Sequence, residues 1–179
     1  SLKEIAEYKP DVKVSLEYKM TEPRIRLFAG TVGKSLLAVE EAGADNLGIT
    51  IDIGHSLLAY EGLAEAAVLA AKRNKLFHLH MNDCFRRSDD DLIVGAVHLV
   101  EYLELFYWLN KTGYEGWFSF DQFPYREDPV HAVSESVKNL RFMFSVLERL
   151  DEESLQEVFK TGDATKAVAV IRKALGGES

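Results

Sequence analysis

Acidic and imidazole side chains stand where several short β-rich runs of the sequence end, and these residue types can bind a metal ion. Four of them close four different runs: Glu17, Asp52, His80 and Asp121. Three carboxylates and one imidazole form a hard donor set that suits Mn²⁺, Mg²⁺ or Co²⁺ better than a structural zinc ion. The alternative is that each residue is a solvated strand-end acid or a hydrogen-bonded core histidine. Four buried polar groups would be costly without an ion, so we predict a metal site.

A second set of candidate ligands lies close to the first in the sequence. His55 follows Asp52 in a D-x-x-H motif, and it could bind a second ion or orient a substrate hydroxyl. Asp89-Asp90-Asp91 lies in the loop after the third β-rich run, and the outer two acids of such a motif can hold one cation. The alternative is a solvated acidic run that caps the next helix. We predict a second metal site formed by His55, Asp89 and Asp91.

The motif Glu17-Tyr18-Lys19 places a lysine and an acid on the same side of an extended chain. A lysine beside a metal-binding glutamate can donate a hydrogen bond to a substrate oxygen and stabilise developing negative charge. The alternative is a simple ion pair between the two side chains. We predict that Lys19 is a catalytic residue.

The elements that must position these residues alternate along the chain. Short β-rich runs are expected at 12–17, 47–53, 76–81 and 116–120. Amphipathic helices are expected at 32–42, 63–73, 97–111 and 130–150, and two further helices follow from residue 151, separated near Gly162. Strands that alternate with helices are typical of βαβ units and predict a parallel sheet.

Each predicted strand has one apolar face and one more polar face, which distinguishes two kinds of α/β fold. A doubly wound sheet is apolar on both faces, whereas one face of a (β/α)8 TIM barrel lines the barrel interior. We therefore predict a TIM barrel, with residues 1–150 as its C-terminal half and 151–179 as a helical tail. A complete barrel takes about 250 residues, so we expect an N-terminal half as a partner.

Charge and composition exclude several classes of protein. The chain has 21 Lys and Arg against 29 Asp and Glu, and the resulting net charge of −8 argues against nucleic-acid binding. No apolar stretch is long enough for a transmembrane helix. The single cysteine, Cys84, rules out a disulfide framework within the chain and favours a reducing compartment. We expect a cytoplasmic protein that does not bind a membrane.

Four segments together resemble the xylose isomerase-like barrel superfamily, and within it the L-rhamnose isomerase branch of bacterial sugar isomerases. They are SLEYKMTEPR at 15–24, TIDIGHS at 50–56, HLHMND with DDDLIVG at 78–95, and FSFDQFPYREDP at 118–129. The resemblance implies conversion of an aldose such as L-rhamnose into a ketose, with two divalent ions. It implies Mn²⁺ as the ion, with Mg²⁺, Co²⁺ and Zn²⁺ as alternatives.

The resemblance also implies roles for individual residues. The first, structural ion would be bound by Glu17, Asp52, His80 and Asp121. The second, catalytic ion would be bound by His55, Asp89 and Asp91, with Glu17 bridging both ions. Lys19 would contact the substrate oxygen at carbon 1. Whether hydrogen moves as a hydride or through an enediol stays open.

Three other functions remain as alternatives. A metal-dependent phosphodiesterase of the endonuclease IV type would carry D-x-H in the later loop and a glutamate at the last strand, where this chain has Asp89-Asp90-Asp91 and Asp121. A sugar epimerase of the superfamily would also need that glutamate and lacks the E-x-K motif. The third alternative is a non-catalytic half-barrel that assembles through its open sheet edges. We expect the protein to form a homo-oligomer.

Overall fold

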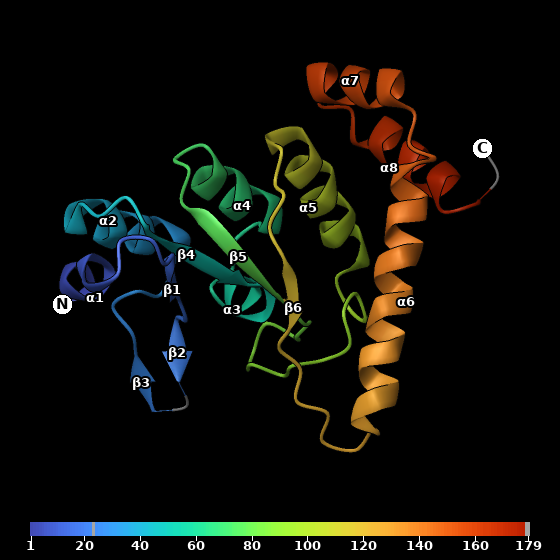
Figure 1. The fold of residues 1–179 in the computed structure, drawn as a ribbon. Coiled ribbons are helices and arrows are strands. Elements are labelled where there is room, and N and C mark those ends of the chain that lie inside the picture. Colours follow the sequence, from blue (N-terminus) through green and yellow to red (C-terminus); the bar gives the residue numbers. More distant parts are fainter. Residues whose placement is uncertain (23, 178–179) are drawn as a thin grey trace.

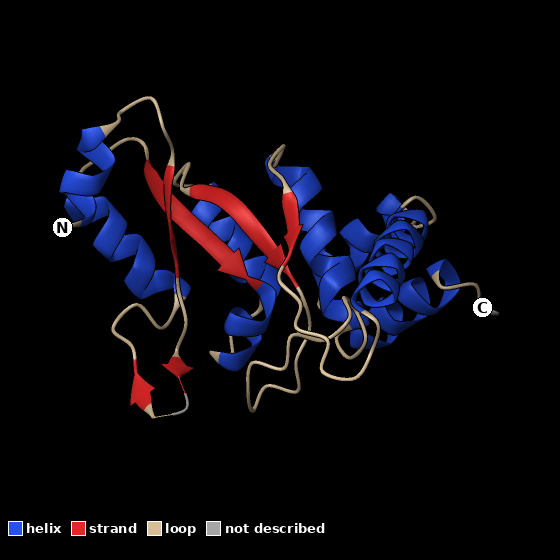
Figure 2. Ribbon diagram, turned by 60° about the horizontal axis from the view of Figure 1, so that its bottom comes forward, coloured by secondary structure: helices blue, strands red, loops and turns tan. Residues whose placement is uncertain are grey.

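The computed structural model describes residues 1–22 and 24–177, and its centre is a parallel sheet of four strands. In spatial order these strands are β1 (Val14–Glu17), β4 (Leu47–Asp52), β5 (Leu76–Met81) and β6 (Phe118–Phe120). Each strand is parallel to its neighbours, so the C-terminal ends of all of them meet at one end of the sheet (Figure 2). The predicted α/β class with a parallel sheet is confirmed.

The helices that follow the strands cover one side of this sheet. They are α2 (Val32–Ala42), α3 (Ile53–Leu58), α4 (Leu63–Ala71), α5 (Leu99–Thr112) and α6 (Pro129–Leu147). Helices α2 and α4 pack on β4, α4 packs against α5, and α5 packs against α6 (Figure 1). The fully buried side chains of Ile49, Ile51 and Leu79 form part of the core with these helices. Burial of this apolar face leaves the polar residues of the strands to the other face.

Polar side chains on that other face bond to one another across the strands. Ser15 Oγ of β1 lies 2.7 Å from Thr50 Oγ1 of β4, and His78 Nε2 of β5 lies 2.8 Å from Ser119 Oγ of β6. These pairs lie deeper in the sheet than the strand ends and fix neighbouring strands in register.

The ends of several elements differ from the prediction. The strands expected at 12–17 and 116–120 are shorter, and the helices expected at 97–111 and 130–150 become Leu99–Thr112 and Pro129–Leu147. The N–H of Val12 donates to the Lys9 carbonyl in a turn, which keeps Val12 out of β1. Four short elements were not predicted: α1 (Leu2–Tyr8), α3, and the two strands of a hairpin, β2 (Thr21–Glu22) and β3 (Ile25–Arg26).

The two tail helices are confirmed as α7 (Glu152–Thr161) and α8 (Ala164–Ala174). Gly162 separates them with a φ of 66°, a left-handed conformation that glycine adopts without a steric penalty. Phe159 of α7 contacts Tyr107 and Trp108 of α5, which holds the tail against the main body. None of the helices that the structure describes has the length and apolar character needed to cross a membrane.

Candidate metal centre and active site

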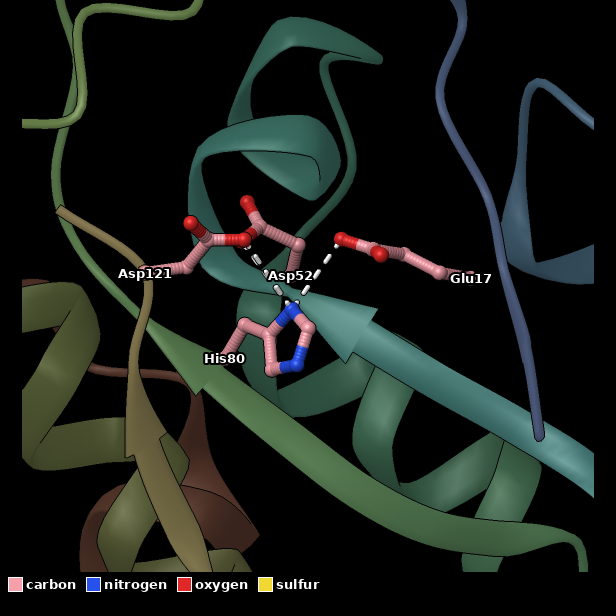
Figure 3. Close-up of side chains that lie close together, drawn as sticks. All are labelled: Glu17, Asp52, His80 and Asp121. Carbon is pink, nitrogen blue, oxygen red and sulfur yellow. Dashed lines mark hydrogen bonds and ion pairs between the residues drawn. The ribbon is translucent and has the colours of Figure 1, made fainter. Parts of the chain in front are cut away.

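Four predicted ligands meet at the C-terminal end of the sheet (Figure 3). Each comes from a different strand or from the residue after it: Glu17 from β1, Asp52 from β4, His80 from β5 and Asp121 after β6. His80 Nδ1 lies 3.1 Å from Glu17 Oε1, 3.3 Å from Asp121 Oδ2 and 3.9 Å from Asp52 Oδ2. One ligand atom from each of the four lies within 4.8 Å of the others.

Burial and charge act differently on the members of this group. The side chain of Asp52 is fully buried, and burial raises the pKa of its carboxyl to about 6. The hydrogen bond between Glu17 and His80 lowers the pKa of the acid and raises the pKa of the imidazole. Several acidic oxygens therefore share one histidine, and a divalent cation would supply the positive charge that they lack.

The donor chemistry fits such an ion. Carboxylate oxygens and one imidazole nitrogen within a few ångströms of one another match the ligands that Mn²⁺, Mg²⁺ and Co²⁺ accept. Within the described residues, His55 Nδ1 and Asp89 Oδ1 are buried side-chain atoms without a hydrogen-bond partner. Buried polar atoms normally find partners, so this pair marks a second position that fits a cation.

The second group consists of Asp52, His55 and Asp89. His55 Nε2 lies 3.0 Å from Asp89 Oδ2, and His55 Nδ1 lies 3.4 Å from Glu17 Oε1. Burial opposes the charged form of Asp89, but hydrogen bonds with His55 and Lys19 outweigh it and lower the pKa of this acid to about 2. Asp52 is the common member of the two groups, whereas the resemblance implies Glu17 in that position.

Asp91 lies beside the second group and is not one of its members. Its Oδ1 accepts a hydrogen bond of 3.4 Å from Asn82 Nδ2. Burial and the charges of Asp89 and Asp121 raise the pKa of Asp91 to about 6. Asp89 therefore contacts His55 and Asp91 contacts Asn82, and the binding of one cation by both acids stays a prediction.

Lys19 is paired with acids other than the one expected. Its Nζ lies 2.8 Å from Asp89 Oδ2 and 2.8 Å from Glu22 Oε1. Burial opposes its charge, but the hydrogen bonds with both acids raise the pKa of the lysine. Lys19 also lines a cavity of about 780 Å³ that Asp89 and Asp91 border, so its ammonium group stands where a ligand can reach it.

Two buried contacts near the site were not predicted. Asn82, directly after β5, is fully buried and donates to both carboxylate oxygens of Asp52. Tyr18 donates a hydrogen bond of 2.7 Å to Glu61, which also accepts from the N–H of Val32 at the start of α2. The position of Asn82 two residues after His80 was the available signal, because alternate strand residues share a face. Glu61 carries no comparable signal in the sequence.

Comparison with known proteins gives a family and two related enzymes. A family model described as the xylose isomerase-like TIM barrel matches residues 1–143. The xylose isomerase of Streptomyces lividans is 32% identical over 125 residues, which are 69% of this chain and 32% of that protein. The xylose isomerase of Thermus thermophilus is 29% identical over 123 residues, 68% of this chain and 32% of that protein. The chain thus spans about a third of the length of these relatives.

Solved structures of sugar epimerases share the fold. A D-tagatose 3-epimerase-like protein has a TM-score of 0.65 and 25% identity, over 82% of this chain and 51% of that one. The 3-keto-D-glucoside 4-epimerase of E. coli has a TM-score of 0.63 and 23% identity, over 78% of this chain and 49% of that one. These proteins share the fold described above over about half of their own chains.

Proposed function

Because the chain belongs to the xylose isomerase-like TIM barrel family, we propose that it carries the metal centre of a sugar isomerase that interconverts an aldose and a ketose. The observation that carries the proposal is the position of Lys19, whose ammonium group lies 2.8 Å from Asp89, beside the two groups of ligand atoms. An acidic cluster alone would fit many metal-dependent reactions. A lysine at its edge adds a donor for an oxygen of the substrate.

Two divalent ions, with Mn²⁺ as our first choice, would hold and polarise adjacent oxygens of the sugar. The first would be bound by Glu17, Asp52, His80 and Asp121. The second would be bound by His55, Asp89 and Asp91, of which the first two are already in contact through Nε2 and Oδ2.

The chain's own residues would orient the substrate and the metal ligands. The raised pKa of Lys19 keeps its Nζ protonated at neutral pH, so it acts as a charged hydrogen-bond donor to the substrate oxygen at carbon 1 and not as a base. Asp89, with a pKa of about 2, stays ionised and orients His55 and Lys19.

We propose L-rhamnose as the first sugar to assay and a closed barrel as the active form. Residues 1–150 would form the C-terminal half of that barrel, residues 151–179 a helical tail, and an N-terminal half would supply the other strands. A homo-oligomer would complete the assembly.

The assay uses the chain co-expressed with a segment that supplies the other barrel strands, with Mn²⁺ added and sugars followed by NMR. We expect slow appearance of the 2-ketose from L-rhamnose or another aldose. Epimerisation is the second candidate, because sugar epimerases share the fold. Interconversion of two ketoses with no aldose formed would favour it over isomerisation. Metal-loaded protein that converts no sugar in either way would contradict the proposal.

A further inference from the structure

Asn82 lies between the two groups of ligand atoms without belonging to either. Its Nδ2 donates to Asp52 over 2.9 Å to Oδ2 and 3.2 Å to Oδ1, and to Asp91 Oδ1 over 3.4 Å. Its Oδ1 accepts a hydrogen bond of 2.7 Å from the N–H of Gly54, next to His55. One fully buried amide therefore bonds to the shared ligand Asp52, to Asp91 and to the backbone that carries His55.

The surroundings leave this amide no freedom to move. The hydroxyl of Tyr102 in α5 donates to the backbone carbonyl of Asn82, so the main chain is held as well as the side chain. A Cβ atom at Gly54 would lie 2.9 Å from Asn82 Oδ1 and 3.1 Å from Asp89 Oδ1. A contact under 3.0 Å forces its neighbour to shift, so position 54 accepts glycine and excludes a side chain while Asn82 stays in place.

The chemistry of the amide suits it to this place. The carboxylate of Asp52 is fully buried and that of Asp91 is partly buried, so their charged forms need donors nearby. The amide nitrogen of asparagine has two N–H groups, so it can donate hydrogen bonds to two carboxylates at once. It carries no charge, so it does not replace the cation that these carboxylates would bind. Its oxygen accepts the N–H of Gly54, which ties the amide to the backbone that carries His55.

We propose that Asn82 is a positioning residue that fixes Asp52 and Asp91 relative to each other, so that both ion sites depend on it. The inference rests on the metal centre of the proposed function. Partners that orient metal ligands typically contribute 10- to 100-fold to metal affinity. Because Asp52 is common to both groups, loss of the amide should weaken binding of both ions and not of one alone.

The test is calorimetric titration of Mn²⁺ into the metal-free chain and its variants. Asn82→Ala should bind both ions 10- to 100-fold more weakly than the unmodified chain. Asn139→Ala is the matched control, because Asn139 Nδ2 donates to the Val94 carbonyl in the same loop region and touches no ligand. A merely structural role for Asn82 would lower the melting temperature of Asn82→Ala and leave its metal affinity equal to that of the Asn139→Ala control.

Asn82→Ser provides a second test of the same amide, because its short hydroxyl side chain lacks the Nδ2 group that donates to Asp52 and Asp91. We expect the same joint weakening of both ions, and this variant decides the matter if Asn82→Ala does not fold. Mn²⁺ affinity within twofold of that of the unmodified chain would overturn the inference. The measurement is made on Asn82→Ala if it folds, and otherwise on Asn82→Ser. If the unmodified chain itself bound no Mn²⁺, the metal centre of the proposed function would fail first, and this inference with it.

Discussion

Asp52 is the residue at which both ligand groups meet, and it is also the most deeply buried of the candidate ligands. Its carboxylate caps α3 by accepting the N–H of His55 over 2.9 Å, so the same side chain begins the helix that carries His55. A strand-end acid that also serves as a helix cap has its orientation fixed from two sides. Asp52 of the D-x-x-H motif therefore has a structural role besides its place in both ligand groups.

Replacing Lys19 with methionine tests catalysis at the scale of one residue. In the complete barrel, Lys19→Met should lower kcat for aldose conversion by roughly two orders of magnitude, because a charged donor to the transition state is lost. Bound metal and melting temperature should change little, since Asp89 keeps its contact with His55 and Glu22 is half exposed. Lys34→Met, at an exposed position on α2, is the control. Loss of folding in Lys19→Met with normal folding of Lys34→Met would favour the ion-pair alternative.

Proton competition gives the metal centre a defined pH dependence. The hydrogen bond with Glu17 raises the pKa of His80 above 6.5, and the pKa of His55 is also raised, because contacts with Asp89 and other acids outweigh its burial. A metal ion must displace these protons, so we expect Mn²⁺ affinity to fall as the pH is lowered through the raised pKa values. Calorimetry in buffers of different ionisation enthalpy should show proton release near pH 6.5.

The metal-free protein should show the opposite trend. A histidine whose pKa is raised in the folded state stabilises the fold fully below pH 6.5, and this contribution is lost as the pH rises through the folded-state value. The melting temperature of the metal-free chain should therefore fall as the pH rises above 6.5, while that of the Mn²⁺-loaded chain rises. Parallel trends for the two forms would contradict the proposed role of His80.

The β5–α5 loop, which carries Asp89 and Asp91, is closed at its base by one buried acid. Asp83 accepts hydrogen bonds from the N–H of Cys84, of Val97 and of His98, at 2.8 to 2.9 Å. His98 Nδ1 also lies 2.7 Å from it. The acid joins the two ends of the loop and gives it a fixed conformation without a helix or strand.

Asp83→Asn tests this element, because it keeps the shape of the side chain and replaces one accepting oxygen with a donor. Unsatisfied buried groups cost about 1–3 kcal/mol each, so we expect a loss of roughly that size in the free energy of unfolding. Binding of the ion at His55 and Asp89 should be affected more than binding of the ion at Glu17 and His80, because this loop carries Asp89. Urea unfolding and Mn²⁺ titration measure the two effects, with Asp45→Asn in an exposed loop as the control. Unchanged stability would contradict the role of Asp83.

The sequence predicted elements that carry regular patterns and missed those that do not. Strand β5 and helix α2 have the predicted bounds. Polar and apolar residues alternate along β5, and Gly43 ends α2. The β2–β3 hairpin has two residues in each strand, too few for any periodic signal. Because alternate residues of a strand share a face, the sequence predicted that Glu17, Asp52 and His80 lie on the same side of the sheet. The partners of Asp91 and Lys19 could not be predicted, because loop side chains follow no period.

On the scale of the whole molecule, the sheet is open at both edges. Among the described residues, β1 and β6 each pair with one strand only. The side chain of Asp121 is 55% exposed, so the ligand groups face solvent on this side. Charged groups stabilise a reacting substrate only weakly in water. A closed barrel of eight strands would exclude water from the site.

The 179-residue chain on its own should therefore bind metal without measurable isomerase activity. Activity should appear when a segment supplying the other barrel strands is co-expressed. NMR of L-rhamnose and other aldoses, with and without that segment, measures the difference. Robust turnover by the isolated monomeric chain would show that the half-barrel interpretation is wrong.

The central claim is that side chains from four strand ends form a divalent metal centre, and titration of Mn²⁺ into the metal-free chain tests it most directly. We expect saturable binding to the unmodified chain. The variants Asp52→Asn, His80→Ala and Asp121→Asn should each bind more weakly, and Asp52→Asn should weaken both ions because it belongs to both groups. All three variants would be checked for folding by circular dichroism. Unchanged Mn²⁺ affinity in all three folded variants would contradict the account.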